Sequence, residues 1–479
     1  MTVAVSCLQS PKKAREALWK KSQSKLVMNP CLDRMLVSFQ ANRKLPVYRW
    51  LKYKEGFSAE FVRYAMRELT NSSGVLLDPF AGTGTALFAA RRMGWDAIGI
   101  ELLPVGFFAM EARLAAERVR ARDFGNELQR IGRIRWDRYF DAEHKLAHVP
   151  ITRGAFPDKT ERSIAGYRAY CSRMKNGSMK KLFDLACLSV LESVSYTRKD
   201  GQYLRWDRRA GRERTSSNFD KGQIADFDSA IQRKLQEICS DLRDDRESRP
   251  GLLEQLAEKD KIGTLDLRRG SCLEMLPQME GESVDLVLTS PPYCNRYDYT
   301  RTYALELVYL GIDADQLKAL RQNMLSCTVE NRTKVSQLRE LYQRCEQKQV
   351  FDGIIGAFER QKALQEVLGV LEELGAAGKL NNSNIPNMVR NYFLEMAFVI
   401  YELGRILRPG ARIVMVNDNV RYAGEEIPVD LILSDFSREF GMRTETIWTL
   451  ARGKGNSSQQ MGSHGRSELR KCVYVWEKD

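Results

Sequence analysis

The 479-residue sequence has few of the residues that build metal sites and disulfide frameworks. It contains three histidines and ten cysteines, and no two cysteines form a C-x-x-C pair. His144 and His148 are four residues apart and could share a helix face, but no third ligand lies near them. We therefore expect no metal site. The scattered cysteines are typical of reduced thiols in the cytosol rather than of a disulfide framework.

Long apolar runs are also missing. The amino-terminal stretch MTVAVSCLQSPKKAREALWKK has no apolar segment long enough for a secretory signal, and nowhere do about 18 uncharged apolar residues follow one another. The sequence thus predicts a soluble, cytoplasmic protein with no membrane partner. Acidic residues are fewer than basic ones: the sequence has 62 aspartates and glutamates and 75 lysines and arginines, so its formal net charge is +13. Such an excess favours a polyanionic partner such as nucleic acid.

The sequence does contain strand signals that are separated by helical patterns. Alternation of this kind predicts an α/β fold with a doubly wound, mostly parallel, Rossmann-like sheet and large helical insertions. The seven strand signals lie at 75–78, 95–101, 264–267, 284–290, 411–416, 444–450 and 471–476.

A glycine-rich turn follows the first strand in LLDPFAGTGTALFAA. Gly82 and Gly84 leave the backbone bare, so a ligand can approach the turn and the helix N-terminus. Asp78 ends this strand and Glu101 ends the next, where an acid commonly accepts both hydroxyls of a ribose. A carboxylate at Asp78 suits a cation better than a pyrophosphate. We therefore expect a positively charged nucleoside, and S-adenosylmethionine meets that description; the alternative is an ordinary turn with a helix-capping aspartate.

The strand at 284–290 ends abruptly on Ser-Pro-Pro-Tyr, residues 290–293. Prolines cannot donate to a sheet ladder, so this corner either has a use or is a rigid turn without a ligand.

Together these stretches resemble the S-adenosylmethionine-dependent amino methyltransferases, which methylate the exocyclic amine of cytosine or adenine in DNA. DPFAGTGT (78–85) resembles motif I, TSPPY (289–293) motif IV and YRWLKYKEGFSAEFV (48–62) motif X. GSCLEML (270–276) stands where the adenine-contacting motif III belongs, and LRPGARIVMVNDN (407–419) resembles the segment after motif V. The resemblance implies these cofactor-binding residues: Lys54, Phe57, Ser58, Asp78, Pro79, Phe80, Gly82, Gly84, Thr85, Glu101, Ser271 and Cys272.

The resemblance also assigns roles to the corner. The Ser290 side chain and the Pro291 carbonyl are expected to accept the two N–H bonds of the amine, with Pro292 helping to fix the carbonyl's direction. Tyr293 offers a ring on which the extruded base stacks. Serine at this place is typical of cytosine enzymes, which favours cytosine N4 and leaves adenine N6 as the alternative. Cys294 adjoins the corner, but ring-carbon methylation uses a Pro-Cys pair and is not expected.

On this resemblance we divide the chain into six segments. They are a basic amino-terminal arm or packed helix (1–45), the cofactor half of the methyltransferase core (46–110), a helical insertion that is the candidate target recognition region (111–262), the catalytic strand (263–301), a second helical insertion (302–385) and the carboxyl-terminal strands (386–479). The large insertion lies between the second and third strands, which departs from the known orders of the family.

DNA recognition is expected from the insertions, because the strand signals run nearly to Asp479. Segment 198–221 carries eight basic residues against four acids, interleaved with aromatics. Segment 295–301 follows the corner directly, and the loop at 451–471 is a third candidate. The alternative for each is a solvated or structurally packed loop. The nucleic-acid-binding candidates are Arg198, Lys199, Arg205, Trp206, Arg208, Arg209, Arg296, Tyr297 and Tyr299.

Three functions fit these features. The first is a site-specific methyltransferase of double-stranded DNA, paired with a restriction or defence nuclease. An RNA or tRNA methyltransferase shares the core, and a catalytically silent scaffold could bind S-adenosylmethionine and DNA. The intact Asp78, Glu101, Ser290 and Tyr293 argue against the scaffold.

Overall fold

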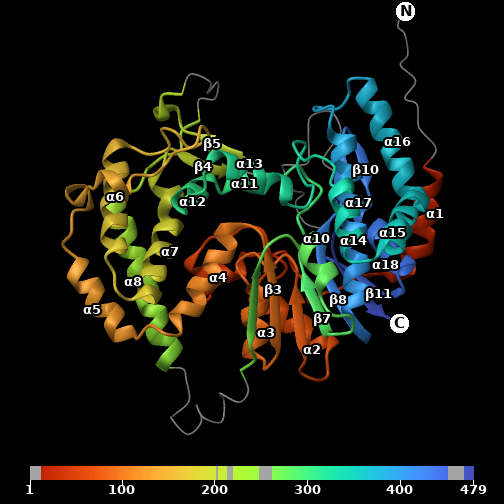
Figure 1. Ribbon diagram of the computed structural model, residues 1–479, viewed down its shortest axis with the longest axis horizontal. Helices are drawn as coiled ribbons and strands as arrows, with labels where there is room; N and C mark the ends of the chain where they lie inside the picture. Colours follow the sequence, from red (N-terminus) through yellow and green to blue (C-terminus); the bar gives the residue numbers. More distant parts are fainter. Residues whose placement is uncertain (1–11, 201–202, 213–218, 248–261, 451–468) are drawn as a thin grey trace, which may run out of the picture.

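The computed structural model describes residues 12–200, 203–212, 219–247, 262–450 and 469–479 (Figure 1). Among these residues, none of the helices combines the length and the apolar character that a membrane crossing needs.

The centre of the molecule is an eight-stranded sheet with the strand order β1-β11-β12-β8-β7-β2-β3-β6. β12 is antiparallel to both of its neighbours, and all other pairs are parallel. The strands are β1 (Leu26–Met28), β2 (Val75–Asp78), β3 (Asp96–Glu101), β6 (Leu265–Arg269), β7 (Val284–Thr289), β8 (Leu407–Asp418), β11 (Met442–Thr449) and β12 (Lys471–Lys478). The Rossmann-like fold predicted from the sequence is therefore confirmed, and its seven expected strands are all present.

The eighth strand comes from the segment expected to be an arm. β1 pairs in parallel with β11, and the preceding helix α1 (Lys13–Ser22) packs on the body. Arg15 of α1 is 9% exposed and forms ion pairs with Glu366 at 2.7 Å and with Glu425. The described part of segment 1–45 therefore includes a helix packed on the body, and Leu18 and Leu26 bury apolar surface against the core.

Two helical layers cover the sheet, so its central strands β2 and β7 are buried on both faces. Alternate residues of β2 show the division: Leu76 packs with α2 (Ala59–Leu69) and α3 (Thr85–Arg92), whereas Leu77 packs with α17 (Ile385–Ile406) and α18 (Val429–Glu439). The neighbouring α4 (Pro104–Ala116) leads away from the sheet into the first insertion.

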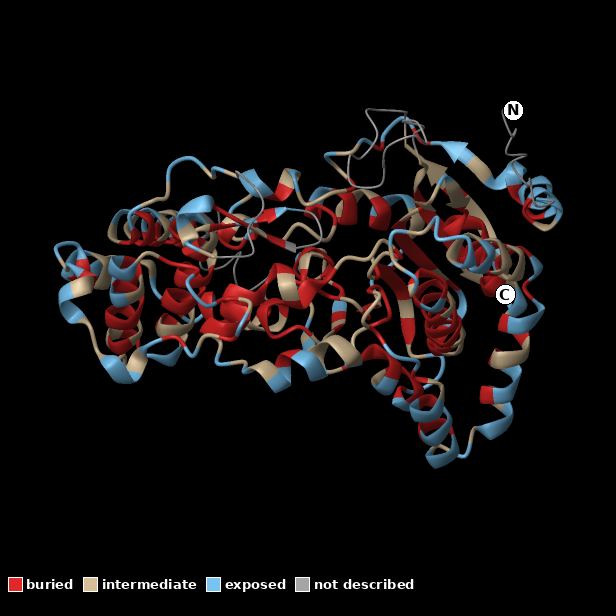
Figure 2. Cartoon of the chain, turned by 90° about the horizontal axis from the view of Figure 1, so that it is seen from above, coloured by how far each residue is buried: buried red, intermediate tan, exposed pale blue. Residues whose placement is uncertain are grey.

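The first insertion forms a helical body at one end of the molecule (Figure 1). It contains α5 (Ala121–Ile131), α6 (Asp158–Ser172), α7 (Gly177–Val194), α8 (Phe227–Glu247) and the hairpin of β4 (Thr197–Asp200) with β5 (Tyr203–Trp206). Buried residues continue from this body into the sheet (Figure 2). The core of the body also takes in α11 (Tyr299–Thr302), α12 (Ala304–Tyr309) and α13 (Ala314–Asn323), which follow β7 in sequence.

The second insertion is therefore divided between two bodies. α14 (Val335–Arg344), α15 (Lys348–Arg360) and α16 (Lys362–Ala376) pack with α17 on the far side of the sheet. The remaining short elements are α10 (Cys272–Met275), β9 (Val420–Tyr422), β10 (Glu425–Ile427) and the 3-10 turns Gln23–Lys25, Ala41–Lys44, Tyr48–Trp50, Trp136–Tyr139, Ala142–His144, Arg208–Ala210 and Leu276–Gln278.

Candidate active site

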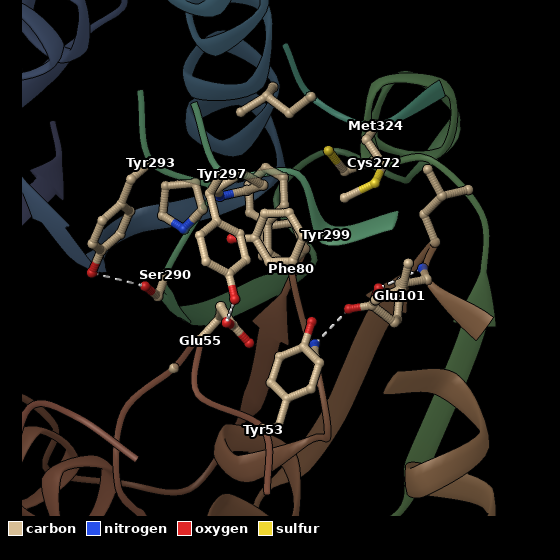
Figure 3. Close-up of a pocket in the computed structure, with 18 of the residues that line it drawn as sticks. Tyr53, Glu55, Phe80, Glu101, Cys272, Ser290, Tyr293, Tyr297, Tyr299 and Met324 are labelled. Atoms are coloured by element: carbon tan, nitrogen blue, oxygen red, sulfur yellow. Dashed lines mark hydrogen bonds between the residues drawn. The ribbon is translucent and has the colours of Figure 1, made fainter. Parts of the chain in front are cut away.

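The carboxyl ends of five strands open onto one cavity of about 440 Å³, a size that suits a nucleoside-sized ligand (Figure 3). The glycine turn after β2 and the Ser-Pro-Pro-Tyr corner after β7 both line it, because β2 and β7 are parallel neighbours. The strand-end residues that line the cavity are Pro79, Phe80, Gly82, Glu101, Gly270, Ser271, Cys272, Ser290, Pro291, Pro292, Tyr293 and Asp418. The two regions singled out in the sequence thus meet in space.

The turn after β2 depends on two glycines in the left-handed region. Gly82 has φ 54° and Gly84 has φ 77°. A Cβ at Gly84 would lie 2.9 Å from the Met110 side chain, so no larger residue fits without a shift. Gly84 is also the N-cap residue of α3, and it lines neither of the two cavities at this edge of the sheet. Its part in the site is therefore to shape the turn.

Asp78 connects the two halves of the site. Its Oδ1 accepts hydrogen bonds from the Phe80 backbone N–H at 3.1 Å and from the Thr289 hydroxyl at 2.6 Å. Burial raises the pKa of Asp78 to about 7, although both hydrogen bonds lower it. Asp78 lines a second cavity of about 290 Å³, which shares Tyr53, Gly56 and Gly82 with the first. A ligand with a cationic end and a nucleoside end has room to extend through both.

Glu101 lies at the opposite side of the glycine turn. Its two carboxylate oxygens accept the backbone N–H groups of Gly82 and Leu103, each at 2.6 Å. Burial raises the pKa of Glu101 to about 7, and the charge of Asp78 adds to the rise. Figure 3 shows the carboxylate at the wall of the cavity, where it can accept ribose hydroxyls.

The segment before α2 supplies a third wall. Tyr53, Lys54, Glu55 and Gly56 line the main cavity, and Phe57 and Thr85 line the smaller one. Ser58 lines neither. Its hydroxyl is buried, accepts the Phe61 N–H at 3.1 Å and donates to the Leu36 carbonyl at 2.6 Å. Ser58 therefore caps α2 and has no free group for a cofactor.

The corner after β7 presents all four of its residues to the cavity. The Ser290 hydroxyl donates to the Tyr293 hydroxyl at 3.4 Å, and burial raises the pKa of Tyr293, so its phenol is neutral at physiological pH. Cys294 is fully buried and does not line the cavity, and burial raises the pKa of its thiol well above the ordinary value. These facts do not favour a thiolate nucleophile, in line with the expectation from the sequence.

Several residues of the cavity had no distinguishing signal in the sequence. Glu55 accepts hydrogen bonds from the hydroxyls of Tyr297 and Tyr303, and the Tyr53 ring stacks on Tyr303 at 5.0 Å between centroids. Figure 3 shows the Glu55 carboxylate against the Tyr297 hydroxyl. Glu55 belongs to the motif X segment, residues 48–62. The sequence did not single it out, because a lone carboxylate in a predicted loop is usually a solvent-exposed residue. Only the fold brings the tyrosines of 297–303 against it.

The nucleic-acid candidates divide into buried and accessible groups. Lys199 is 5% exposed, with its Nζ 2.5 Å from Glu306 and 4.0 Å above the Tyr303 ring. Trp206 is 8% exposed and is covered by the Arg212 guanidinium at 4.0 Å. Burial removes both residues from the candidate DNA surface. They stabilise the hairpin instead, as the packed-loop alternative allowed.

The other basic candidates of the hairpin region lie nearer the surface. Arg198 is exposed, whereas Arg205 stacks on Phe219 at 4.2 Å, and Arg208 and Arg209 form ion pairs with Asp220. After the corner, Arg296 has φ 65° and donates to Asn381 at 2.8 Å, and Tyr297 and Tyr299 line the main cavity. Most of the third candidate, loop 451–471, lies outside the described residues.

The buried Lys199–Glu306 pair leads to a prediction about stability. Lys199→Met leaves the Glu306 carboxylate buried without its partner, and we expect it to lower the free energy of unfolding by roughly 3–5 kcal/mol. Lys199→Met/Glu306→Leu is expected to recover much of the loss. Urea titration followed by circular dichroism measures both. Arg198→Ala is the control, since an exposed side chain in the same strand should change stability by less than about 0.5 kcal/mol.

Neither histidine of the 144/148 pair is free to take a metal without losing a partner. His144 contacts Asp141 at 3.2 Å, and His148 contacts Glu161 at 2.6 Å. Within the described residues, no group of three His, Cys, Asp or Glu side chains is arranged to hold a metal ion.

The fold and the cavities define a class of protein: a Rossmann-like methyltransferase in which the glycine turn after Asp78, the carboxylate of Glu101 and the Ser-Pro-Pro-Tyr corner at residues 290–293 line adjoining cavities. Comparison with known proteins agrees. Residues 11–105 match the family described as DNA methylase. The chain is 45% identical over 477 residues to the Type II methyltransferase M.AvaI of Nostoc sp. (strain PCC 7120), across 99% of this chain and 95% of that protein.

A second relative supports the same assignment. The Type II methyltransferase M.BsoBI of Geobacillus stearothermophilus is 38% identical over 461 residues, across 93% of this chain and 88% of that protein. The chain therefore belongs to the N6/N4 DNA methylase family of amino methyltransferases, as the resemblance of its motifs indicated. Enzymes of this family depend on S-adenosylmethionine, so the cofactor expected from the sequence is confirmed.

The raised pKa values predict how cofactor affinity depends on pH. Asp78 has a pKa of about 7 in the free protein, and its ionised form is the one that attracts a cation. We expect the affinity for S-adenosylmethionine to fall as the pH drops below 7, by up to about tenfold per pH unit for each of the two carboxylates, Asp78 and Glu101, that must be ionised to bind it. Calorimetric titration between about pH 5.5 and pH 8.5 measures this. Asp78→Asn should bind weakly at every pH and depend less on it; an unchanged profile would contradict the assignment.

Proposed function

We propose that the protein is a site-specific methyltransferase that transfers the methyl group of S-adenosylmethionine to the N4 amine of a cytosine flipped out of double-stranded DNA. One observation carries the proposal. The Thr289 hydroxyl donates a hydrogen bond to Asp78 at 2.6 Å. This bond holds the Ser-Pro-Pro-Tyr corner beside the glycine turn, and the two segments line adjoining cavities. Donor and acceptor groups bound there would meet without any domain movement.

The residues present suit the cofactor. The glycine turn gives close backbone approach, Glu101 faces the place of a ribose, and buried Asp78 gains by facing a cation. When bound, S-adenosylmethionine supplies an electrophilic methyl group and a thioether leaving group. Cys272 and Ser271, after β6, line the same cavity and lie where the adenine ring is expected.

The corner would prepare the amine for attack. The cytosine amine is a weak nucleophile because its lone pair is conjugated into the ring. Acceptance of its two N–H bonds by the Ser290 hydroxyl oxygen and the Pro291 carbonyl favours a tetrahedral nitrogen whose lone pair points at the methyl group. The Pro291–Pro292 backbone has few conformations, so these acceptors are held before the base arrives. Tyr293 would stack on the base, because its neutral ring lines the same cavity.

Serine at position 290 supports cytosine over adenine. In the structure the Ser290 hydroxyl donates to Tyr293, and its oxygen can still accept one N–H of the base. Adenine enzymes of the family more often carry aspartate at this place. Adenine-N6 methylation is the alternative.

For the DNA surface we propose the exposed basic face of the β4–β5 hairpin with the tyrosines beside the corner. Arg198, Arg205, Arg208 and Arg209 would contact phosphates, and Arg296, Tyr297 and Tyr299 would contact the target nucleotide. Both relatives are named Type II methyltransferases, and we include in the proposal that this chain likewise acts on double-stranded DNA beside a cognate restriction nuclease.

The proposal is tested by incubating the purified protein with labelled S-adenosylmethionine and duplex DNA, single-stranded DNA or tRNA. The products are then digested to nucleosides and analysed by mass spectrometry. We expect N4-methyldeoxycytidine from duplex DNA. N6-methyldeoxyadenosine would establish the alternative base, label on tRNA alone would favour an RNA enzyme, and cofactor binding without any transfer would indicate a scaffold.

A further inference from the structure

Asp418 is a carboxylate of the cavity that the steps above do not use. It ends β8, and β8 extends beyond β7: Thr289, the last residue of β7, pairs with Met415, three positions before Asp418. Asp418 therefore lies at the rim of the sheet beside the corner, and it lines the main cavity together with Ser290 and Tyr293.

Its side chain has an unsatisfied oxygen. The Oδ1 atom of Asp418 is buried and has no hydrogen-bond partner among the residues that the structure describes. Lys471 of β12 is paired directly opposite, but no ion pair joins these two described side chains. A buried carboxylate oxygen without a partner costs free energy, so its persistence beside a reaction site is a sign of use.

Methyl transfer to an amine creates a need for such a group. The nitrogen lone pair forms the new N–CH3 bond while the electron pair of the S–CH3 bond moves to sulfur. The nitrogen then carries a positive charge and one proton too many. Ser290 and Pro291 are neutral acceptors, and neither is a base strong enough to hold that proton at physiological pH.

We infer that Asp418 is a further catalytic residue, the acceptor of the proton that the methylated exocyclic nitrogen releases. The N–H electron pair returns to nitrogen, which becomes neutral, and the proton forms an O–H bond with the Asp418 carboxylate. The inference rests on the proposed function, because it requires an amine bound at residues 290–293.

The surroundings of Asp418 suit a proton acceptor. Burial raises the pKa of the Asp418 carboxyl above its ordinary value, while the charges of Lys471 and Arg34 lower it. A raised pKa makes the carboxylate a better base than an exposed aspartate. The nearby Tyr293 phenol is neutral, and the charge of Asp418 contributes to the rise in its pKa. The titratable groups that interact with Asp418 are Lys471, Arg34, Tyr293, Cys472 and Tyr474.

The test is Asp418→Asn, which keeps the shape of the side chain but cannot take a proton. Single-turnover rates are measured on duplex DNA with S-adenosylmethionine saturating at each pH. For the unsubstituted protein we expect the rate to fall as pH drops through the pKa of Asp418, because the protonated carboxyl cannot act. We expect the rate of Asp418→Asn to be roughly 30-fold lower near pH 8. This loss is smaller than that usually seen for a general base, because the proton leaves during or after methyl transfer and not before it. This fall with pH should be absent in the variant.

Two further variants separate the chemistry from packing. Asp418→Glu retains a carboxylate, and we expect it to recover part of the rate and the fall at low pH. Asp315→Asn, at a side chain that is 92% exposed on α13, should match the unsubstituted protein. Cofactor affinity by calorimetry should be the same in all four proteins.

The outcomes distinguish the two proposals. If the unsubstituted protein methylates no nucleic acid, the proposed function fails, and the role of Asp418 fails with it. If it methylates DNA while Asp418→Asn stays within about threefold of its rate and keeps the fall at low pH, the inference alone is overturned. It is also overturned if the asparagine and glutamate variants are equally slow at every pH.

Discussion

We expect Ser290→Ala to lower the single-turnover rate of methyl transfer by on the order of 10²–10³-fold, while S-adenosylmethionine binds with unchanged affinity. The Ser290 hydroxyl oxygen lies at the corner of the cavity, where it would accept one N–H of the amine. Loss of one preorganised hydrogen-bonding group at a reacting centre typically has an effect of this size. The interaction strengthens as the nitrogen gains positive charge, so its loss should act on the rate more than on binding.

Rapid-quench kinetics with preformed protein–DNA complexes measures this rate, and calorimetry measures cofactor affinity. Ser283→Ala is the matched control, because Ser283 immediately precedes β7 and donates to the Glu280 carbonyl away from the cavity. Its rate should equal that of the unsubstituted protein. Equal losses of cofactor affinity and of rate in Ser290→Ala would mean that the corner shapes the cofactor site rather than the amine.

The second large effect is expected at Glu101. Glu101→Ala removes a buried carboxylate that accepts the N–H groups of Gly82 and Leu103 and faces the proposed ribose. Two charge-assisted hydrogen bonds to ribose hydroxyls contribute about 3 kcal/mol together, which corresponds to roughly 150-fold in Kd for S-adenosylmethionine. Glu101→Gln keeps the shape and one acceptor oxygen, so its loss should be smaller.

Calorimetric titration with S-adenosylmethionine gives these affinities, and methyl transfer at saturating cofactor gives the complementary measurement. We expect the rate of Glu101→Ala to recover within about tenfold once the cofactor site is filled, because Glu101 lies at the far side of the turn from the corner. A Kd within about threefold of the original would show that this carboxylate holds the turn and not the ribose.

Short stretches of sequence predicted much of the lining of the main cavity. The apolar strand before Asp78, the glycines after it and the Pro-Pro corner each specify backbone geometry through neighbouring residues, so they can be recognised in one dimension. All seven expected strands exist, and the structure adds that Gly82 and Gly84 both have positive φ. The eighth strand at 26–28 was not predicted, because three residues at a sheet edge carry too weak a pattern.

The roles of charged residues were harder to predict. Lys199 and Arg198 look alike in sequence as members of one basic segment, yet the first is buried against Glu306 and the second is exposed. Alternation along β4 puts them on opposite faces, but sequence alone does not say which face is covered. Glu306 is 107 residues from Lys199 and belongs to a different expected segment.

The sequence by itself determined the fold class and the positions of the glycine turn and of the Ser-Pro-Pro-Tyr corner, because each depends on local backbone preferences and on the period of apolar residues. The tertiary structure alone decided which side chains share the cavity. Glu55 and Asp418 reach the corner only because parallel strands and the segments around them end at one edge of the sheet, and contacts over hundreds of residues leave no mark on the local pattern.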